Sequence, residues 1–500
     1  MKRIITIIIM AIGLLSAGWY HNYGTEHTDY GMFVKQVGES EYIIVGTTFN
    51  PHSPATVDSS GDVYVIKINE NGDLLWTNQY GSDHMEGGFS ALIDGDTILI
   101  EGLHSNWGIT ATMGNIYCLT INSSGEIIEE KVFGDSLSKC YDIERTPSGE
   151  LVLFGCSYGP SGLAYQKVWG LSLNDTWDTV GYFSFLTDST HTVVYPGNLS
   201  VFSQGILGIA TAVDSTYETP HMNSTYGLVV GFSATMDDTL WTKIIRGELF
   251  STSLNEIIKT NDDSAFAIVG TAYRFTSSMY LFEPYPHFTI ISQSGDILVN
   301  RTIFTLSIME GNSIKQLPSG DFVIAGTYRD ADVGVIKIDM YGTVLWGNYL
   351  DFGRIEEINY LDLTDDGGFI LVGSSRDDPN PAAERDVLVV KTDSLGNVSW
   401  VKQIPVRPQD MKISAYPNPF NSEISIEITL PENEYGEIEI YSLRGQLVRK
   451  LYSGELKSGV NYFKWDGKDN NGTPVSSGIY LVKTKASNGF SDSKEILLLK

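Results

Sequence analysis

The chain has 500 residues, 42% of them hydrophobic, so it is long enough for more than one domain and apolar enough to fold around packed cores. Its formal net charge is −28 and it has no cluster of more than two or three Lys or Arg residues, which argues against a nucleic-acid partner because phosphate binding needs a basic face. The 50 glycines and 27 tyrosines favour short strands and tight turns over helices.

The chain begins with the features of a secretory signal peptide, which we predict over residues 1–18. Lys2 and Arg3 give a positive start, and Ile4–Leu15 is an apolar stretch too short for a stable membrane span. Small residues follow at Ala17 and Gly18, where we expect cleavage. The alternative is an uncleaved N-terminal anchor. After cleavage we expect no transmembrane segment, because no other stretch is apolar enough.

From residue 20 to residue 405 the sequence repeats one unit seven times. Each unit contains a short strand, a second strand that ends in a small residue, a variable loop, a third strand, a glycine turn and a fourth strand. The small residues that end the second strands are Gly46, Gly102, Gly155, Ala210, Gly270, Gly326 and Gly373. Four antiparallel strands recurring every ~40–55 residues are typical of a propeller blade, so we predict an all-β fold with a seven-bladed β-propeller over residues 20–405. A β-solenoid is the competing architecture.

Two features of the repeat indicate how the blades pack. The second strands, such as IIVG and FVIAG, are continuous apolar runs, as expected for strands buried between neighbouring blades. The small residue at their end is expected to permit tight packing or a bulge. Fourth strands carry tryptophans that we expect to pack between blades, namely Trp76, Trp241, Trp346 and Trp400. The units resemble propeller repeats of secreted and surface proteins from Bacteroidetes-like bacteria.

The three cysteines are too few for a disulfide framework. Residues 139–145 and 150–157 predict a hairpin around the turn TPSG at 146–149, which would place Cys140 opposite Cys156. Opposed strand residues can form a disulfide when the pair is not hydrogen-bonded. Two buried free thiols are the alternative.

Several sequence motifs for catalysis are absent: HExxH, CxxC and GxxxxGK[ST] do not occur. We therefore assign no catalytic residue and expect no enzyme and no transition-metal site. Adjacent carboxylates at residues 262–263, 365–366 and 377–378 fit turn chemistry. A carboxylate pair that faced a central channel could instead hydrolyse glycosides.

Long loops join the second and third strands of several units, so they should emerge on one face of the propeller. The stretch YLFEPYPHF at 280–288 is the best candidate for a binding loop, with Tyr280, Phe282, Tyr285 and His287 as its contact residues. Its aromatic rings could contact a glycan or a protein. The alternative is a loop that packs its own aromatics over a blade edge.

After a linker at 406–412, residues 413–500 change character. Short segments alternate apolar and polar residues with turns between them, which predicts a small Ig-like β-sandwich. Pro417 and Pro419 hold the chain extended at the start of this region.

Four ordered motifs occur in this region: YPNPFN (416–421), IYSLRGQLVRKL (440–451), WDGKDNNGTPVSSGIYLVK (465–483) and KEILLLK (494–500). They resemble the type A C-terminal sorting domain of the type IX secretion system, and the later block is also similar to the Ig-like domain of flagellar hook-capping proteins. The resemblance assigns the sorting motif to Pro417, Asn418, Pro419, Gly445, Trp465, Gly478, Tyr480 and Lys494. It implies export through the periplasm and recognition of the tail by the type IX machinery.

The segment WDGKDNNG has two interpretations. It is a hairpin turn rich in Asp, Asn and Gly, or a weak Ca²⁺ loop through Asp466, Asp469 and Asn471. The acidity of the chain likewise fits solubility or surface Ca²⁺ binding. No other cofactor is expected.

The sequence favours a secreted or cell-surface cargo of the type IX secretion system whose propeller binds a glycan or a protein. Two alternatives stay open: a polysaccharide-active enzyme with carboxylates on the propeller loop face, and a structural or adhesin-like envelope protein.

Overall fold

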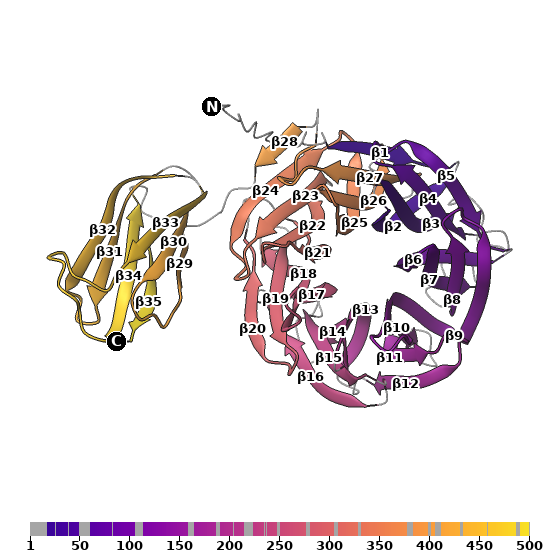
Figure 1. Cartoon of the computed structure of the whole chain (residues 1–500), viewed down its shortest axis with the longest axis horizontal. Helices are drawn as coiled ribbons and strands as arrows, with labels where there is room; N and C mark the ends of the chain where they lie inside the picture. Colours follow the sequence, from indigo (N-terminus) through magenta and orange to yellow (C-terminus); the bar gives the residue numbers. More distant parts are fainter. Residues whose placement is uncertain are drawn as a thin grey trace, which may run out of the picture.

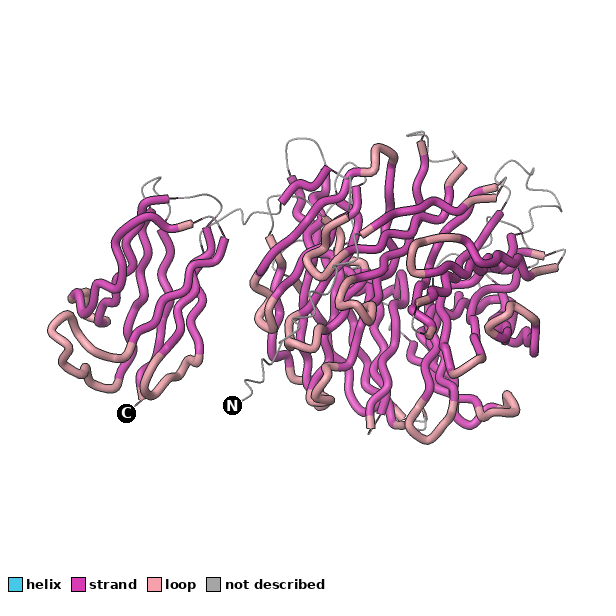
Figure 2. Tube along the Cα trace, turned by 45° about the horizontal axis from the view of Figure 1, so that its top comes forward, coloured by secondary structure: helices cyan, strands magenta, loops and turns pink. Residues whose placement is uncertain are grey.

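The structure is a computed structural model of the whole chain. It describes residues 18–25, 27–38, 40–49, 61–82, 84–105, 114–158, 165–186, 191–203, 205–214, 224–234, 236, 238–247, 251–276, 281–304, 309–328, 332–377, 384–398, 402–405, 412–430, 434–457, 459–486 and 491–499. Within these ranges the regular secondary structure consists of strands, as Figure 2 shows, which confirms the predicted all-β class.

Blades one to three contain the following strands. The first blade has β2 (Thr28–Val37), β3 (Glu41–Phe49), β4 (Gly61–Asn69) and β5 (Leu74–Tyr80). The second has β6 (Met85–Asp94), β7 (Thr97–Ser105), β8 (Gly114–Asn122) and the start of β9 (Ile127–Arg145). The third has the end of β9, β10 (Leu151–Tyr158), β11 (Tyr165–Leu173) and β12 (Thr179–Leu186).

Blades four to seven continue the pattern. The fourth has β13 (His191–Phe202), β14 (Gly205–Asp214), β15 (Ser224–Ser233) and β16 (Thr239–Ile245). The fifth has β17 (Ser251–Lys259), β18 (Ala265–Thr276), β19 (Leu281–Ser292) and β20 (Ile297–Thr302). The sixth has β21 (Ser313–Gln316), β22 (Phe322–Tyr328), β23 (Asp332–Ile338) and β24 (Val344–Asp351). The seventh has β25 (Ile355–Leu363), β26 (Phe369–Arg376), β27 (Asp386–Thr392) and β1 (Trp19–Tyr23).

Figure 1 shows these blades arranged radially in a ring. The described residues form a buried apolar cluster between each pair of neighbouring blades. One of these clusters joins the first blade to the last, because Ile44 and Ile66 pack with Ile370 and Val389. The arrangement is that of the predicted seven-bladed β-propeller, and the apolar second strands lie in the inter-blade cores as expected.

The expected outer strand of the seventh blade was wrong. The sequence predicted that its outer strand would be the Trp400 segment, but β1 takes that place and pairs with β27. The segment β28 (Lys402–Pro405) instead pairs with β24 and extends the sixth blade, while Trp400 lies outside the described residues. The reason is that β1 supplies a tryptophan of its own: Trp19 lies opposite Lys391, just as Trp346 lies opposite Lys337.

The described tryptophans of the outer strands pack between blades, as predicted. Trp241 Nε1 donates a hydrogen bond to Gln293 O in the next blade at 3.2 Å, and the turn of Gly295 lies against its ring. Trp19 makes the same contact across the ring closure, since its Nε1 donates to Glu70 O at 2.8 Å. These rings are therefore committed to packing and are not available for stacking on a ligand.

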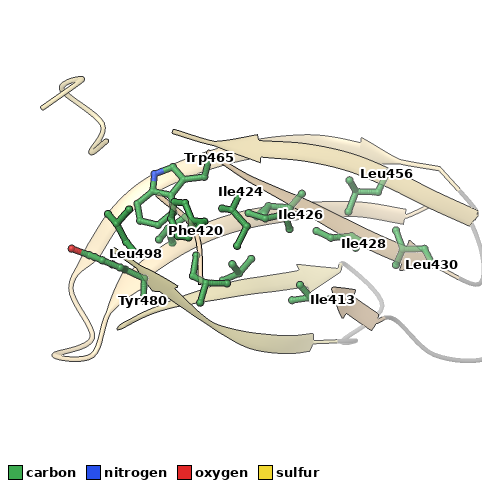
Figure 3. Packing of buried hydrophobic residues seen from close by; sticks show 14 residues of the cluster. Ile413, Phe420, Ile424, Ile426, Ile428, Leu430, Leu456, Trp465, Tyr480 and Leu498 are labelled. Atoms are coloured by element: carbon green, nitrogen blue, oxygen red, sulfur yellow. The ribbon is translucent and has the colours of Figure 1, made fainter. Parts of the chain in front are cut away.

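Residues beyond 412 form two facing sheets. One contains β29 (Lys412–Tyr416), β30 (Ile424–Leu430) and β33 (Gly459–Trp465), and the other contains β31 (Glu434–Ser442), β32 (Leu447–Leu456), β34 (Gly478–Ala486) and β35 (Ser491–Leu498). Alternate apolar residues of both sheets point inward to a shared core, shown in Figure 3. This confirms the predicted Ig-like β-sandwich.

Candidate functional site

Each innermost strand of the propeller has at least one residue more than its partner strand, and β13 has a second register shift between Val193 and Tyr195. In the first blade, Gly31 pairs with Gly46 and Phe33 pairs with Val45, so Met32 is extra. Such a β-bulge leaves the extra residue unpaired and turns its side chain away from the regular pattern. The described blades place the extra residue at Met32, Phe89, Tyr141, Asn198, Asn255, Asn312 and Asn359.

The repeat glycine explains the bulge. A Cβ atom on Gly46 would lie 1.8 Å from Tyr30 O, and one on Gly270 would lie 1.9 Å from Ser253 O. In these two blades the bulged backbone therefore leaves no room for a side chain on the facing residue. The fourth blade is the exception, because Ala210 pairs with Pro196 there. The predicted role of the small residue, which was to permit a bulge, is confirmed.

The bulge residues of all seven described blades line one central cavity of about 590 Å³. They are only half-buried, whereas their strand neighbours are mostly buried. Their chemistry divides the wall into two arcs. Met32, Phe89 and Tyr141 form an apolar arc on blades one to three, and four asparagines form an amide arc on blades four to seven.

The apolar arc includes two nearly parallel aromatic rings. The ring centroids of Phe89 and Tyr141 are 6.2 Å apart, and their planes differ by 18°. Both residues lie at bulges of neighbouring blades, so the fold itself fixes this spacing.

The amide arc is held by hydrogen bonds that link consecutive blades. Asn255 Nδ2 donates to Gly311 O at 2.8 Å and Asn312 Nδ2 donates to Ile358 O at 2.7 Å. Asn359 Nδ2 donates to Gly31 O at 2.8 Å, which joins the last blade to the first. The amide nitrogens of these side chains are engaged in holding the ring together, and their oxygens are hydrogen-bond acceptors.

The charged residues that line the central cavity, called the central channel from here on, are acidic. Glu256 and Glu310 are lining residues, and the described lining contains no Lys, Arg or His. Glu256 forms a buried ion pair with Lys315 and accepts a hydrogen bond from Ser313 Oγ at 2.6 Å. Burial raises the pKa of Glu310, and nearby Glu357 raises it further. Burial also raises the pKa of Tyr273 to about 12.

Two of the three adjacent carboxylate pairs serve local structure, as the sequence suggested, while residue 378 of the third pair lies outside the described residues. Asp262 Oδ1 accepts hydrogen bonds from Thr260 Oγ1 and Ser264 Oγ. Asp366 Oδ1 accepts a hydrogen bond from Gly368 N at 3.0 Å. Across the described ranges, no group of three His, Cys, Asp or Glu side chains is placed to hold a metal ion.

The predicted binding loop at 280–288 is largely a strand. Tyr285 and His287 lie in β19 and are 0% and 1% exposed, so the prediction that they contact a ligand at the surface was wrong. The hairpin of β18 and β19 is longer than expected and draws both side chains into the blade. Tyr280 and the Phe282 side chain lie outside the described residues.

The possible disulfide between Cys140 and Cys156 does not form, because the three buried cysteines are not joined by any disulfide. The hairpin pairs as expected from Leu151 opposite Arg145 to Phe154 opposite Asp142. The bulge at Tyr141 then shifts the register, so Cys140 faces Gly155 instead of Cys156. The same bulge that places Tyr141 in the channel separates the two thiols.

In the tail, the first and last motifs meet. Asn418 Nδ2 donates to Glu495 O at 3.0 Å, and Leu497 N donates to Asn418 Oδ1 at 2.8 Å. Phe420 N donates to Leu497 O at 2.9 Å, which continues the pairing. The segment with the two prolines is thus bound to the edge of the C-terminal strand.

The other aromatic motif residues gather at the same end of the sandwich. Trp465 is 1% exposed and packs edge to face on Tyr480, with ring centroids 5.1 Å apart, while Phe420 lies 5.6 Å from Trp465 (Figure 3). Trp465 Nε1 donates to Lys468 O and Tyr480 OH donates to Ser476 O, so both buried polar groups are paired.

The remaining motif residues have different positions. Gly445 occupies a hairpin turn at a φ of 75°, which favours glycine, and Gly478 begins β34. Lys494 is exposed on β35. Of the Ca²⁺ candidates, Asp466 pairs with Lys468 at 2.8 Å, and Asp469 Oδ1 accepts hydrogen bonds from Asn471 N and Thr473 N. These contacts favour the hairpin-turn interpretation of this segment.

Comparison with known proteins finds similarity in the tail. The FlgD Ig-like domain family matches residues 419–489. The basal-body rod modification protein FlgD of Salmonella typhimurium is 51% identical over 45 residues, which is 9% of this chain and 19% of that protein. The FlgD of Salmonella typhi matches to the same extent. The chain therefore spans about a fifth of the length of these curated relatives.

Solved structures with a similar course of the chain include PorZ, a surface component of the type IX secretion system of Porphyromonas gingivalis. It is 10% identical with a TM-score of 0.40, covering 92% of this chain and 58% of that one. A fungal alcohol oxidase of the AA5 family in complex with copper is 12% identical with a TM-score of 0.42, covering 98% of this chain and 100% of that one.

Residues 1–17 of the predicted signal peptide lie outside the described part of the chain. No helix long and apolar enough to span a membrane occurs among the residues that the structure describes.

Proposed function

We propose that this chain is an exported protein of the cell surface or the external medium. Its signal peptide (1–18) would direct it to the periplasm, and its C-terminal sandwich (413–500) would serve as a type IX sorting domain. The propeller (20–405), joined by the linker at 406–412, would be a binding module for a glycan or a protein.

The observation that carries the proposal is the convergence of the tail motifs. Asn418 and Leu497 are far apart in the sequence, yet they are joined by a hydrogen bond of 2.8 Å at the end of the sandwich where Trp465 and Tyr480 pack. A sorting signal read from a folded domain needs such a preformed surface, because a partner that binds ordered residues does not have to order them first.

The test is localisation of variants in a bacterium with a type IX secretion system. Deletion of residues 413–500 should leave the protein trapped in the periplasm. Asn418→Ala should reduce surface display, because it removes both hydrogen bonds to β35. Lys457→Ala, an exposed change elsewhere in the sandwich, is the matched control. Normal surface display of the truncated protein would refute the proposal.

A further inference from the structure

We propose that the central channel of the propeller binds a neutral sugar unit, with the apolar arc against its C–H face and the amide arc against its hydroxyl groups. The inference rests on the proposed role of the propeller as a binding module and gives that role a place and a ligand class. The cavity of about 590 Å³ lies within the ~300–1,000 Å³ range of small-molecule sites.

The two arcs match the two sides of a sugar ring. Phe89 and Tyr141 are stacked with planes that differ by only 18°, and both line the cavity, so an aromatic ring there can receive the flat C–H face of a sugar. The facing wall carries Asn198, Asn255 and Asn312, whose amide oxygens can accept hydrogen bonds from sugar hydroxyls. Few polar groups in an otherwise apolar pocket fix the orientation of a ligand.

Hydrogen-bond donors in the channel are largely engaged already, which disfavours a peptide. The amide nitrogens of Asn255, Asn312 and Asn359 donate to neighbouring blades. Ser90 Oγ donates to Asp142 Oδ1 at 2.9 Å. A peptide would bring backbone carbonyl groups that need donors, and an unsatisfied buried carbonyl costs ~1–3 kcal/mol. Each sugar hydroxyl, in contrast, can donate to an acceptor on the wall.

The acidic lining selects against negatively charged sugars. With Glu256 already paired with Lys315 and no basic residue in the described lining, a carboxylate or sulfate group would be desolvated on this wall without a cationic partner. Neutral hexose units should therefore bind, and uronic or sialic acids should not.

The experiment is a binding assay of the mature chain, residues 19–500, on an array of neutral and acidic oligosaccharides, followed by titration calorimetry with the best neutral compound. Phe89→Leu and Asn198→Ala should each weaken binding at least tenfold. Phe89→Leu keeps an apolar side chain and removes only the ring. Tyr182→Ala is the control, because Tyr182 is 57% exposed on the outer strand of the third blade.

Thermal unfolding of each variant shows that a loss of binding is not a loss of fold. Binding restricted to acidic sugars or to peptides, the absence of any glycan binding, or neutral binding that neither channel variant changes would overturn the inference. The sugar-binding assay and the localisation assay test different claims. Surface display that depends on the tail is measured without any ligand, so the export proposal can hold even if the channel binds no sugar. If neither channel variant changes glycan binding, the propeller would still be a binding module, but its binding site would lie outside the channel.

Discussion

Gly270 shows how one residue shapes the channel wall. It faces the bulge that places Asn255 in the channel, and a Cβ atom there would lie 1.9 Å from Ser253 O. We expect Gly270→Ala to destabilise the protein by about 1–3 kcal/mol, the usual cost of overpacking, measured by urea unfolding. Ala210→Gly, at the equivalent position of the fourth blade, should cost no more than ~1 kcal/mol. Equal costs for the two changes would contradict the explanation of the bulge.

His287 makes stability depend on pH. Burial lowers its pKa to about 4, while the hydrogen bond to Asn300 opposes that shift. The folded state therefore keeps His287 neutral, and its contribution is fully present above pH 6.5 and is lost as the pH falls from 6.5 through 4. We expect the unfolding free energy of the wild type, relative to His287→Gln, to fall by up to ~3 kcal/mol across this window. A difference that does not vary with pH would show that His287 titrates normally.

At the scale of elements, two segments of the chain fit the same sheet edge. Trp19 of β1 lies opposite Lys391 on β27. Trp400 follows Lys391 by the same nine positions that separate Trp76 from its partner Lys67. The turn that would lead to a hairpin is also formed, since Asp393 N donates to Asn397 O at 3.0 Å.

This duplication predicts non-additive effects on stability. In the full mature chain, Trp400→Ala should change the unfolding free energy by less than ~0.5 kcal/mol, because β1 holds the edge. In a chain that lacks residues 19–23, the segment after Asn397 should take the vacant edge, and Trp400→Ala should then cost ~2–4 kcal/mol, as for truncation of a packed aromatic. The same cost for Trp400→Ala in both backgrounds would show that the two segments do not compete.

The sequence predicted most of the strands because their apolar runs and glycine turns recur at a regular spacing. It did not predict that β1 closes the ring, because five residues beside a signal sequence carry no repeat pattern of their own. The sequence placed Cys140 opposite Cys156 because the bulge at Tyr141 cannot be recognised from the sequence of one strand alone. The extra residue becomes visible only when all seven innermost strands are aligned against the repeat glycines.

The candidate binding residues were harder to predict for a related reason. Tyr285 and His287 were chosen for their chemistry in a stretch taken as a loop, but burial in β19 removes them from the surface. Asn255, Asn312 and Asn359 were overlooked because single asparagines in short strands usually serve turns. Their shared position beside the repeat glycine was the signal that could have identified them.

In the whole molecule, the propeller and the C-terminal sandwich have different structural features. The propeller repeats one type of blade, but its bulge residues are apolar in blades one to three and asparagines in blades four to seven, which gives its channel two chemically different sides. The sandwich brings its first and last motifs together through Asn418 and β35. We propose that the first region selects a ligand and that the second presents a fixed surface for export.

The most direct test of the account is to transfer the tail to a reporter. A periplasmic fluorescent protein with a signal peptide is fused to residues 406–500 and expressed in a bacterium that has a type IX secretion system, with the Asn418→Ala tail as the control. We expect the unaltered tail to carry the reporter to the cell surface or the medium and the altered tail to leave a larger share in the periplasm. Retention of both reporters in the periplasm would contradict the claim that this domain is a sorting signal.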